Sequence, residues 1–379
     1  MSNEPLRVLH AIGAMDRGGA ETLVMNVYRN IDRSKIQFDF LVNESRRCDY
    51  DSEIESLGGK FYRIPRYGIF NYVTYAKACK SFFSSHSYQI VHGHIALPWA
   101  IYLPQAKQHG MFTIAHSHAQ NFPLSPAELA FRASTHPVRY IADFFLACSE
   151  QAGIDRYGKA IVNSGKFHLL QNGIDVEAGR FNIDARNGVR TELGISNDAP
   201  VFGHVGRLTA VKNHDFLLKT FKAIREQLSD AQLLLLGRGE LEDKLRKECV
   251  ELGLTDSVHF LGVRDDVARV LSAMDVFVFT SFKEGLPLAL VEAQASGLPC
   301  LASTGVPELA KVRSQTAFLD LSAGAEYWGE QAINAYRNAN YSLRADAYLD
   351  ARKAGFDIQE SAKWLEDFYL EVAQEQARH

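Results

Sequence analysis

Two glutamates, Glu284 and Glu292, stand eight residues apart and could act at one site. Glu284 follows an apolar run, Val276–Phe279, that predicts a buried parallel strand, and Glu292 lies in a segment that predicts a helix over Leu288–Ala295. Ligands of open α/β sheets bind at the carboxyl ends of the strands, where a loop carboxylate and a helix carboxylate can face one crevice. The backbone N–H groups of Gly285–Leu288 would favour an anionic or oxygen-rich ligand there. Taken singly, either glutamate would be an ordinary solvated side chain.

Two cations form a second candidate group. Arg207 and Lys212 lie in the segment Gly206–Asn213, Gly-Arg-Leu-Thr-Ala-Val-Lys-Asn, which follows a predicted strand that opens at Val201. Cations aimed at a leaving group that gains negative charge stabilise the transition state more than the ground state. The pair therefore suits a phosphate leaving group, although each side chain alone is more often a surface charge.

Histidines concentrate in the first part of the chain, where nine of the 13 lie within the first 170 residues. His116 and His118 follow a predicted strand, Phe112–Ala115, and His92 and His94 end another. A histidine pair at a strand end either acts on a ligand or is a structural pair held by hydrogen bonds, and both interpretations stay open. His92 and His94 are interpreted as bystanders that line the same cleft.

The sequence offers no obvious metal site. The triplet Asp49-Tyr50-Asp51 is interpreted as a solvated acidic loop, and no His/Cys cluster has ligand spacing. The cysteines are odd in number and scattered, without a Cys-x-x-Cys pair, which argues against a disulfide framework and indicates a reducing cytoplasm. They are Cys48, Cys79, Cys148, Cys249 and Cys300.

A glycine-rich turn joins the first predicted strand, Leu6–Ile12, to a predicted helix that starts at Ala20. Its glycines, Gly13, Gly18 and Gly19, do not fit the dinucleotide pattern Gly-x-Gly-x-x-Gly. The turn could still let a phosphate approach the amino end of the helix, and a turn that only reverses the chain is the alternative.

Strand-like and helix-like segments alternate through both halves of the chain. This alternation, over 379 residues, predicts parallel sheets in two doubly wound α/β domains. Further strands are predicted at 38–42, 61–64, 144–147, 167–170, 232–236, 258–262 and 299–303, and helices at 72–83, 216–227, 241–252 and from 325 to 379.

These motifs together resemble the retaining glycosyltransferases of family 4. Ser-x-x-Glu-Gly-x-Pro followed by Glu-Ala, which places seven residues between the two glutamates, matches that family's signature, as does Gly-Arg-x-x-x-x-Lys-Asn. The segment Asn172–Asp175, Asn-Gly-Ile-Asp, matches the end of the family's first domain. The resemblance implies the GT-B architecture, in which two Rossmann-like domains face each other across a cleft. The expected domains are residues 1–178, completed by a C-terminal helix at about 362–379, and residues 179–361.

The resemblance also implies a role for each candidate residue. Arg207 and Lys212 would hold the donor diphosphate, so that neither a metal ion nor another cofactor is required, and Glu292 would bind the ribose hydroxyls. A first-domain histidine, His116 or His118, would contact the sugar near the reacting carbon. The catalytic set would thus be His116, His118, Glu284, Arg207 and Lys212. Further binding positions would be Gly18 and Gly19 for the diphosphate and acceptor, Gly237 and Gly239 for backbone approach to the nucleotide, Val263 and Arg264 for the nucleobase, and Glu284, Gly285 and Leu286 for the transferred sugar.

The charge distribution bears on the partner and the location. Ser56–Ala127 contains no Asp or Glu but carries Lys60, Arg63, Arg66, Lys77, Lys80 and Lys107. Such a stretch either faces an anionic partner or a membrane surface, or is a solvated face with a chance gap in acids. With no apolar run of membrane-spanning length and no signal-peptide pattern, we expect a cytoplasmic protein with peripheral contact at the inner face of the membrane.

The resemblance therefore implies transfer of a hexose or N-acetylhexosamine from a UDP-sugar to a saccharide acceptor. The opening Gly-Gly-Ala-Glu-Thr resembles the capsule and exopolysaccharide branch of the family, whose acceptors are carried on a lipid diphosphate. A sugar-nucleotide epimerase would share the fold but not the glutamate pair, and a hinged periplasmic binding protein would need a signal peptide. A non-catalytic assembly subunit is the remaining alternative, against which the intact motifs argue. Nothing suggests nucleic-acid binding.

Overall fold

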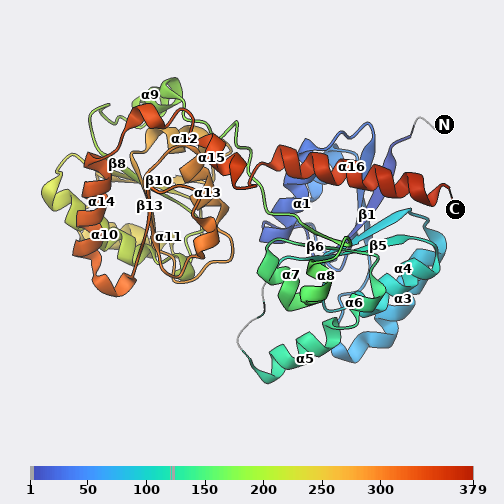
Figure 1. Ribbon diagram of the computed structural model, residues 1–379. Coiled ribbons are helices and arrows are strands. Elements are labelled where there is room, and N and C mark those ends of the chain that lie inside the picture. Colours follow the sequence, from blue (N-terminus) through green and yellow to red (C-terminus); the bar gives the residue numbers. More distant parts are fainter. Residues whose placement is uncertain (1–3, 120, 122–123, 379) are drawn as a thin grey trace. The chain divides into compact units, whose positions relative to one another are not determined.

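The chain forms two compact units in the computed structural model, which describes residues 4–119, 121 and 124–378 (Figure 1). The first unit comprises Met1–Gly173 and Ile358–His379, and the second comprises Ile174–Asp357. The boundaries expected from the sequence, after residues 178 and 361, lie a few residues downstream of these divisions. None of the described helices is both long enough and apolar enough to cross a membrane.

The first unit is built on a parallel sheet in the order β3-β2-β1-β4-β5-β6-β7. The strand order reverses between β1 and β4, which in a doubly wound sheet is where a crevice opens at the carboxyl edge. The strands are β1 (Leu6–Ile12), β2 (Ile36–Val42), β3 (Lys60–Arg63), β4 (Ile90–Gly93), β5 (Phe112–Ser117), β6 (Phe144–Ala147) and β7 (Phe167–Leu169).

Helices cover both faces of this sheet because successive strand residues point to opposite faces, and both sets are apolar. One face packs against α1 and α16, which lie side by side (Figure 1), and the other against α3, α4 and α7. The helices are α1 (Gly19–Asn30), α2 (Asp51–Ser56), α3 (Tyr72–Ser85), α4 (Trp99–Gln108), α5 (Pro126–Thr135), α6 (Val138–Ile141), α7 (Glu150–Tyr157), α8 (Lys159–Val162) and α16 (Ile358–Gln376).

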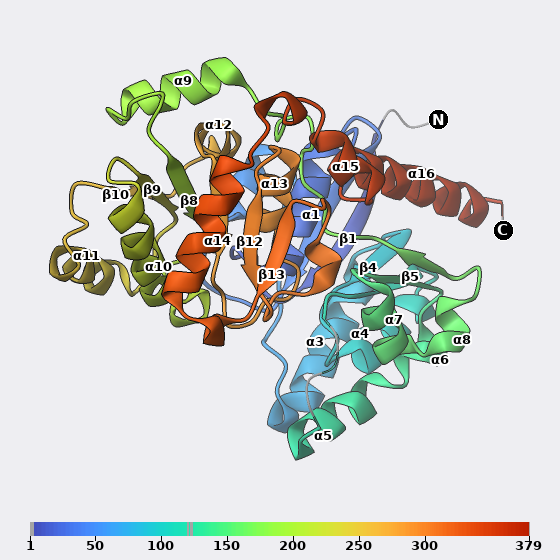
Figure 2. The ribbon, with the colours of Figure 1, turned by 60° about the vertical axis from the view of Figure 1, so that its left-hand side comes forward.

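The second unit repeats this plan with a six-stranded parallel sheet in the order β10-β9-β8-β11-β12-β13. One face packs against α9, α12 and α13, and the other against α10, α11 and α14; Figure 2 shows α14 beside β12. The strands are β8 (Val201–Val205), β9 (Gln232–Leu236), β10 (Val258–Gly262), β11 (Val276–Phe279), β12 (Cys300–Ser303) and β13 (Thr316–Leu319). The helices are α9 (Ile183–Glu192), α10 (His214–Gln227), α11 (Glu242–Glu251), α12 (Val267–Ala273), α13 (Leu288–Ala295), α14 (Ala325–Arg337) and α15 (Tyr348–Lys353).

The elements that flank the predicted glutamates have the bounds expected from the sequence. The strand at Val276–Phe279 is β11, and the helix at Leu288–Ala295 is α13, with Pro287 at its N-cap. The strand expected at Phe112–Ala115 is longer, because β5 continues to Ser117. The segment from 325 to 379, predicted to be helical, contains the three α-helices α14, α15 and α16. Gly355 interrupts it with a φ of 83°, a left-handed conformation that glycine adopts readily.

Candidate functional site

The loops after β8 and β11 bring the predicted residues of the second unit together. Lys212 Nζ lies 2.7 Å from Glu284 Oε1, and the Lys212 ammonium also lies 4.8 Å from the centroid of the Phe279 ring. The two charged side chains are 17% and 14% exposed, so the ion pair is partly withdrawn from water. The structure thus joins a residue of each predicted motif at the carboxyl edge of the sheet.

Backbone contacts hold these two loops in register. The Phe282 N–H donates to the Val211 carbonyl oxygen at 2.8 Å, and the Glu284 N–H donates to the Gly305 carbonyl oxygen at 3.1 Å. The Thr280 hydroxyl lies 3.1 Å from the carbonyl oxygens of both Lys212 and Asn213. These hydrogen bonds fix both loops, and the loops in turn fix the positions of Lys212 and Glu284.

Two predicted glycines support the Arg207 loop. A Cβ atom at Gly237 would lie 2.1 Å from the Gly206 carbonyl oxygen, and one at Gly239 would lie 2.3 Å from the Leu208 carbonyl oxygen. Gly237 also has a φ of 133°. The chain's own backbone therefore lies too close to these two positions for any side chain. This is a structural reason for glycine, in addition to the approach of the nucleotide expected from the sequence.

Glu292 lies on α13 and is partly buried. Its carboxyl group has no hydrogen-bond or ion-pair partner among the described residues, and burial raises its pKa to about 7. A carboxylate poised in this way can gain from hydroxyl donors supplied by a ligand, because such donors stabilise its charged form.

The other predicted residues of the second unit differ in their freedom to meet a ligand. Arg207 is exposed, without an ion pair among the residues that the structure describes, and Val263 is 51% exposed. Arg264, in contrast, is held by Asp266 and Glu192, each 2.7 Å from a guanidinium nitrogen. Gly285 is exposed, and the side chain of Leu286 packs against the core on both sides of α13.

In the first unit, five histidines lie on the sheet face that α1 and α16 cover. His10 is opposite His92 in the pairing of β1 with β4, and His116 lies near the end of β5. The closest ring nitrogens are 3.0 Å apart for His10 and His94, 3.1 Å for His92 and His116, and 2.8 Å for His94 and His118. His92 and His94, expected to be bystanders, thus lie within hydrogen-bonding distance of the candidates His116 and His118, respectively. His10 was not among the predicted residues.

Burial keeps these imidazoles neutral. It lowers the pKa of His10 to about 3 and that of His118 to about 4, and it lowers the pKa of His92, His94 and His116 well below the usual 6.5. A neutral imidazole can donate one hydrogen bond and accept another, or bind a transition metal.

Sheet pairing brings histidines together that show no ligand spacing along the sequence. Two sets of three, His10 with His92 and His94 and His94 with His116 and His118, each place a ring nitrogen from every member within 4.8 Å of the others. The sequence conceals these sets because their members come from different strands. Both nitrogens of His94 are, however, already within hydrogen-bonding distance of other histidines.

The glycine-rich turn opens α1, with Gly18 as the cap and Gly19 as the first helical residue. The Asn172 side-chain amide donates to the Gly19 carbonyl oxygen at 3.2 Å. This hydrogen bond ties the glycine-rich turn to the segment Asn172–Asp175. A Cβ at Gly18 would meet the Glu21 carboxylate at 2.3 Å, whereas a Cβ at Gly19 would meet nothing within 4 Å.

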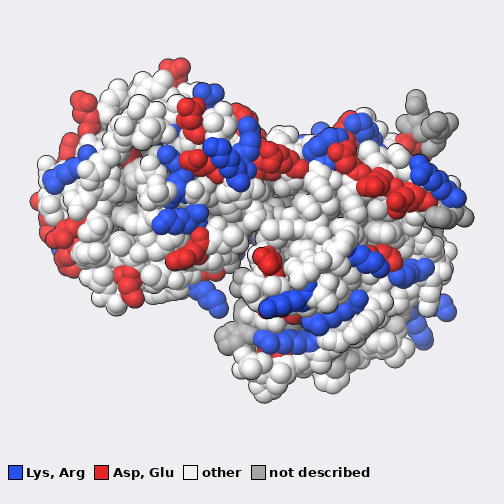
Figure 3. Space-filling model, in the orientation of Figure 1, with Lys and Arg blue, Asp and Glu red and all other residues white. Residues whose placement is uncertain are grey.

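The stretch Ser56–Ala127, which contains no Asp or Glu, is partly neutralised by acidic residues from outside it. Arg63 pairs with Asp51 at 2.8 Å and Lys107 pairs with Asp143 at 2.5 Å. The interpretation of Asp51 as solvated is therefore wrong, because its side chain is only 2% exposed and it begins α2. Elsewhere on the face in Figure 3, basic and acidic side chains are interspersed over both units.

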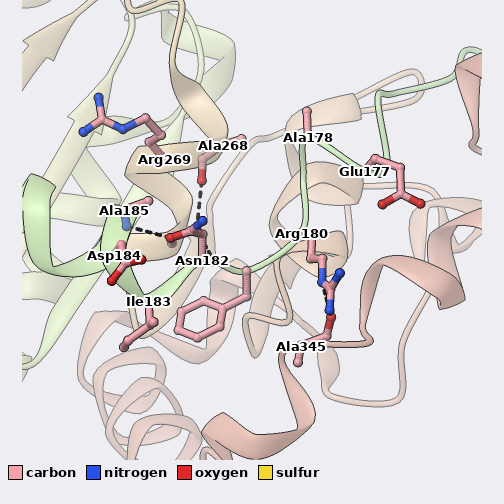
Figure 4. A pocket seen from close by; sticks show the side chains of 12 residues that line it. Glu177, Ala178, Arg180, Asn182, Ile183, Asp184, Ala185, Ala268, Arg269 and Ala345 are labelled. Atoms are coloured by element: carbon pink, nitrogen blue, oxygen red, sulfur yellow. Dashed lines mark hydrogen bonds between the residues drawn. The ribbon is translucent and has the colours of Figure 1, made fainter.

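A pocket of about 770 Å³ lies in the second unit away from these groups. Asn182 caps α9 there by accepting from the Ala185 N–H, and the Arg180 guanidinium donates to the Ala345 carbonyl oxygen (Figure 4). None of the predicted site residues lines it, and its polar groups are largely used by the chain itself.

The chain matches known families and proteins over nearly its whole length. Residues 17–178 match the family described as Glycosyltransferase Family 4, and residues 186–317 match Glycosyl transferases group 1. The chain is 34% identical over 377 residues to the protein named glycosyltransferase EpsF of Bacillus subtilis, covering 97% of both chains. It is also 35% identical over 224 residues, or 56% of each chain, to an Escherichia coli enzyme named UDP-Gal:alpha-D-GlcNAc-diphosphoundecaprenol alpha-1,3-galactosyltransferase.

Solved structures show the same fold. The crystal structure of Anabaena HepE in complex with UDP is similar with a TM-score of 0.76 and 17% identity, over 97% of this chain and 100% of that one. At this identity the likeness speaks for the architecture, which agrees with the two parallel sheets. The chain therefore belongs to the glycosyltransferases that combine a Glycosyltransferase Family 4 region with a Glycosyl transferases group 1 region, and it has the GT-B fold.

Proposed function

We propose that this glycosyltransferase moves a hexose or N-acetylhexosamine from a UDP-sugar to a saccharide carried on a lipid diphosphate, in exopolysaccharide or capsule assembly. The observation that carries the proposal is the Lys212–Glu284 pair. Arg207, which has no ion pair among the described residues, precedes Lys212 in the same loop, and Glu292 lies on the following helix. This set offers cations for a diphosphate and carboxylates for sugar hydroxyls. The name of the Escherichia coli galactosyltransferase and the UDP bound to HepE support the choice of substrates.

The residues divide the work between the donor's parts. Arg207 and Lys212 stabilise the charge that develops on the leaving diphosphate, without a metal ion. Glu284 and the N–H groups of Gly285 and Leu286 hold the transferred sugar, and Glu292 accepts from the ribose hydroxyls. The nucleobase lies near Val263 and Arg264, and Gly237 allows the nucleotide to approach the backbone closely. Gly18 and Gly19 contact the diphosphate and the acceptor.

The transfer retains the configuration of the sugar. The bond between the sugar's anomeric carbon and the phosphate oxygen breaks, and the acceptor oxygen forms its bond to that carbon on the same face. The acceptor's hydroxyl proton passes to the departing phosphate oxygen, so the products are UDP and a lengthened saccharide. His116 or His118 contacts the sugar near the reacting carbon.

Peripheral contact with the inner face of the membrane would bring the enzyme to its acceptor. In the first unit Phe70 is exposed in the turn before α3, and Tyr72 and Val73 are exposed in the first turn of α3. Lys77 and Lys80 lie exposed further along the same helix. Apolar side chains beside lysines suit an anionic bilayer surface.

A substrate panel tests the function. Thermal unfolding with UDP-sugars and GDP-sugars should show stabilisation by UDP-sugars, and transfer should then be measured onto a lipid-diphosphate saccharide in the presence of EDTA. Transfer that EDTA abolishes and magnesium or manganese restores would contradict the metal-free mechanism. Stabilisation by a UDP-sugar without transfer to any saccharide would instead favour a non-catalytic subunit.

A further inference from the structure

Tyr369 of the C-terminal helix is joined to His116 through His92. The Tyr369 hydroxyl lies 2.5 Å from His92 Nδ1, and His92 Nε2 lies 3.1 Å from His116 Nδ1. The planes of the two imidazoles differ by 23° and their centroids are 5.2 Å apart. Each ring nitrogen therefore meets its neighbour close to the ring plane, where its proton or its lone pair points.

The two possible directions of donation along this chain leave different numbers of groups unsatisfied. Each neutral imidazole carries one ring proton, so if Tyr369 donates to His92 Nδ1, then His92 donates from Nε2 to His116 Nδ1. His116 must then carry its own proton on Nε2. In the opposite direction, His116 donates to His92 and His92 to the phenol oxygen, which leaves the Tyr369 hydroxyl proton without an acceptor among the described residues.

The surroundings of Tyr369 make that second arrangement unfavourable. The side chain is 0% exposed, and the rings of His10 and Phe38 pack edge-on against it. Burial raises the pKa of the phenol well above 10, so the hydroxyl keeps its proton. His116 Nε2 is buried without a partner in either arrangement. The first arrangement therefore leaves one buried group unsatisfied, whereas the second leaves two, because the Tyr369 O–H also lacks an acceptor, and each such group is costly.

We infer that Tyr369 and His92 are positioning residues that hold His116 in the tautomer with its proton on Nε2, so that His116 is a hydrogen-bond donor and not a base. Its ligand is an oxygen acceptor, a sugar hydroxyl or a phosphate oxygen of the substrates. This assignment of the ligand rests on the proposed function, whereas the tautomer does not.

The other candidate histidine lacks such a fixed end. His118 is bonded to His94 and His94 to His10, but both ends of this chain, His118 Nδ1 and His10 Nε2, are buried without a partner. No hydroxyl sets its direction within the part of the chain that the structure describes. The two histidines that the sequence left equivalent are thus distinguished, with His116 fixed as a donor and His118 free to adopt either tautomer.

Nitrogen-15 NMR of the full chain labelled at histidine measures the tautomer directly, with the His116 signals assigned from the spectrum of His116→Asn. In the unmodified protein we expect a protonated Nε2 and a bare Nδ1 at His116. Tyr369→Phe should convert this to a mixture of both tautomers. Tyr28→Phe is the matched control, because it removes another fully buried hydroxyl, bonded to Gln37 at 2.6 Å, and should leave His116 unchanged.

Three outcomes would overturn the inference. One is a proton on Nδ1 of His116 in the unmodified protein, which needs no variant to observe. The second is an unchanged tautomer in folded Tyr369→Phe. The third is one equivalent of zinc or another transition metal in the purified protein that is lost in His94→Ala, because such a metal would take nitrogens from the hydrogen-bonded chains.

Activity provides a separate measurement. With UDP-sugar turnover as the assay, Tyr369→Phe should lower kcat about fivefold to tenfold and change its pH profile, while Tyr28→Phe should not. The expected tautomer without any sugar transfer would contradict the proposed function alone. The wrong tautomer in an active enzyme would contradict only the role of Tyr369 and His92.

Discussion

Lys212 Nζ lies 2.7 Å from Glu284 Oε1, so one charged residue of each motif in the second unit is neutralised by one residue of the other. The pair joins two loops that backbone hydrogen bonds keep in place. A diphosphate that takes the lysine must share it with the carboxylate or replace it. The ion pair therefore keeps the lysine extended, which lowers the cost of orienting this flexible side chain at the moment of binding.

Replacing Lys212 by methionine should separate its charge from its packing. Methionine keeps most of the contact with the Phe279 ring but cannot stabilise the leaving diphosphate. We expect kcat to fall about 10²-fold to 10³-fold, the usual loss when one preorganised donor to a developing charge is removed. Steady-state turnover of the UDP-sugar measures this effect.

Lys219→Met is the matched control for that experiment, because Lys219 lies exposed on α10 in the same unit. It should leave turnover unchanged. Equal activity of Lys212→Met and Lys219→Met would remove Lys212 from the transfer step.

Glu284→Gln should affect binding and turnover in opposite ways. The amide keeps the size of the side chain but releases Lys212 from its partner, so the lysine is fully available to the diphosphate. We expect UDP to bind at least as tightly as before, by calorimetry, while sugar transfer falls because the carboxylate no longer holds the sugar hydroxyls. Weaker UDP binding together with normal transfer would contradict this division of roles.

The proximity of Lys212 to Glu284 could be expected from the sequence because the groups of each motif are close along the chain. Glu284 and Glu292 flank one strand-to-helix connection, and Arg207 and Lys212 lie in another, so local spacing and the order of elements define the motifs. Their juxtaposition follows once β8 and β11 are neighbours in a parallel sheet, which the alternation of elements makes natural.

The histidine cluster could not be predicted in this way because sheet pairing assembles it. His10 and His94 are 84 positions apart, and Tyr369 reaches His92 from a helix 277 positions away. A hint was present in the repeated His-x-His at the ends of two strands, since alternate residues share one face of a sheet. The ion pair between Asp51 and Arg63 could not be predicted either. The spacing of Asp49 and Asp51 does not indicate that Arg63, at the end of β3, lies next to Asp51.

Asp275 should be a main determinant of the stability of the second unit. Its carboxylate is 1% exposed and pairs with Arg186 at 2.7 Å and with Arg190 at 2.8 Å, while accepting from the Val201 N–H at 2.8 Å. Asp275→Ala leaves two guanidinium groups without their charge partner, one of them fully buried. Removing one member of such a buried pair typically costs about 3–5 kcal/mol.

The measurement is the free energy of unfolding in urea, followed by a probe within the second unit because the chain has two units. Asp265→Ala, at an exposed position in the same unit, is the control and should change little. A loss of stability no greater than that of the control would mean that the two arginines find other partners.

Glu292 should make donor binding depend on pH. Burial raises the pKa of its carboxyl group to about 7 from a usual 4.5, so the folded protein retains a proton that the unfolded chain releases between these values. The contribution of Glu292 to stability is therefore greatest below about pH 4.5, falls as the pH rises towards 7, and is constant above that. Ribose hydroxyls that donate to the carboxylate favour its ionised form, so binding of the donor should release this proton.

Calorimetry with UDP-glucose between pH 5.5 and 8 tests this coupling, because a diphosphate esterified at both ends does not itself titrate in that range. We expect affinity to rise with pH by up to about tenfold per unit below the pKa and to level off above it. In Glu292→Gln the affinity should be weaker at pH 8 and independent of pH, whereas Glu330→Gln, at an exposed position on α14, should behave as the unmodified protein. A pH dependence that survives in Glu292→Gln would assign the proton to another group and would remove the support for ribose binding by this glutamate.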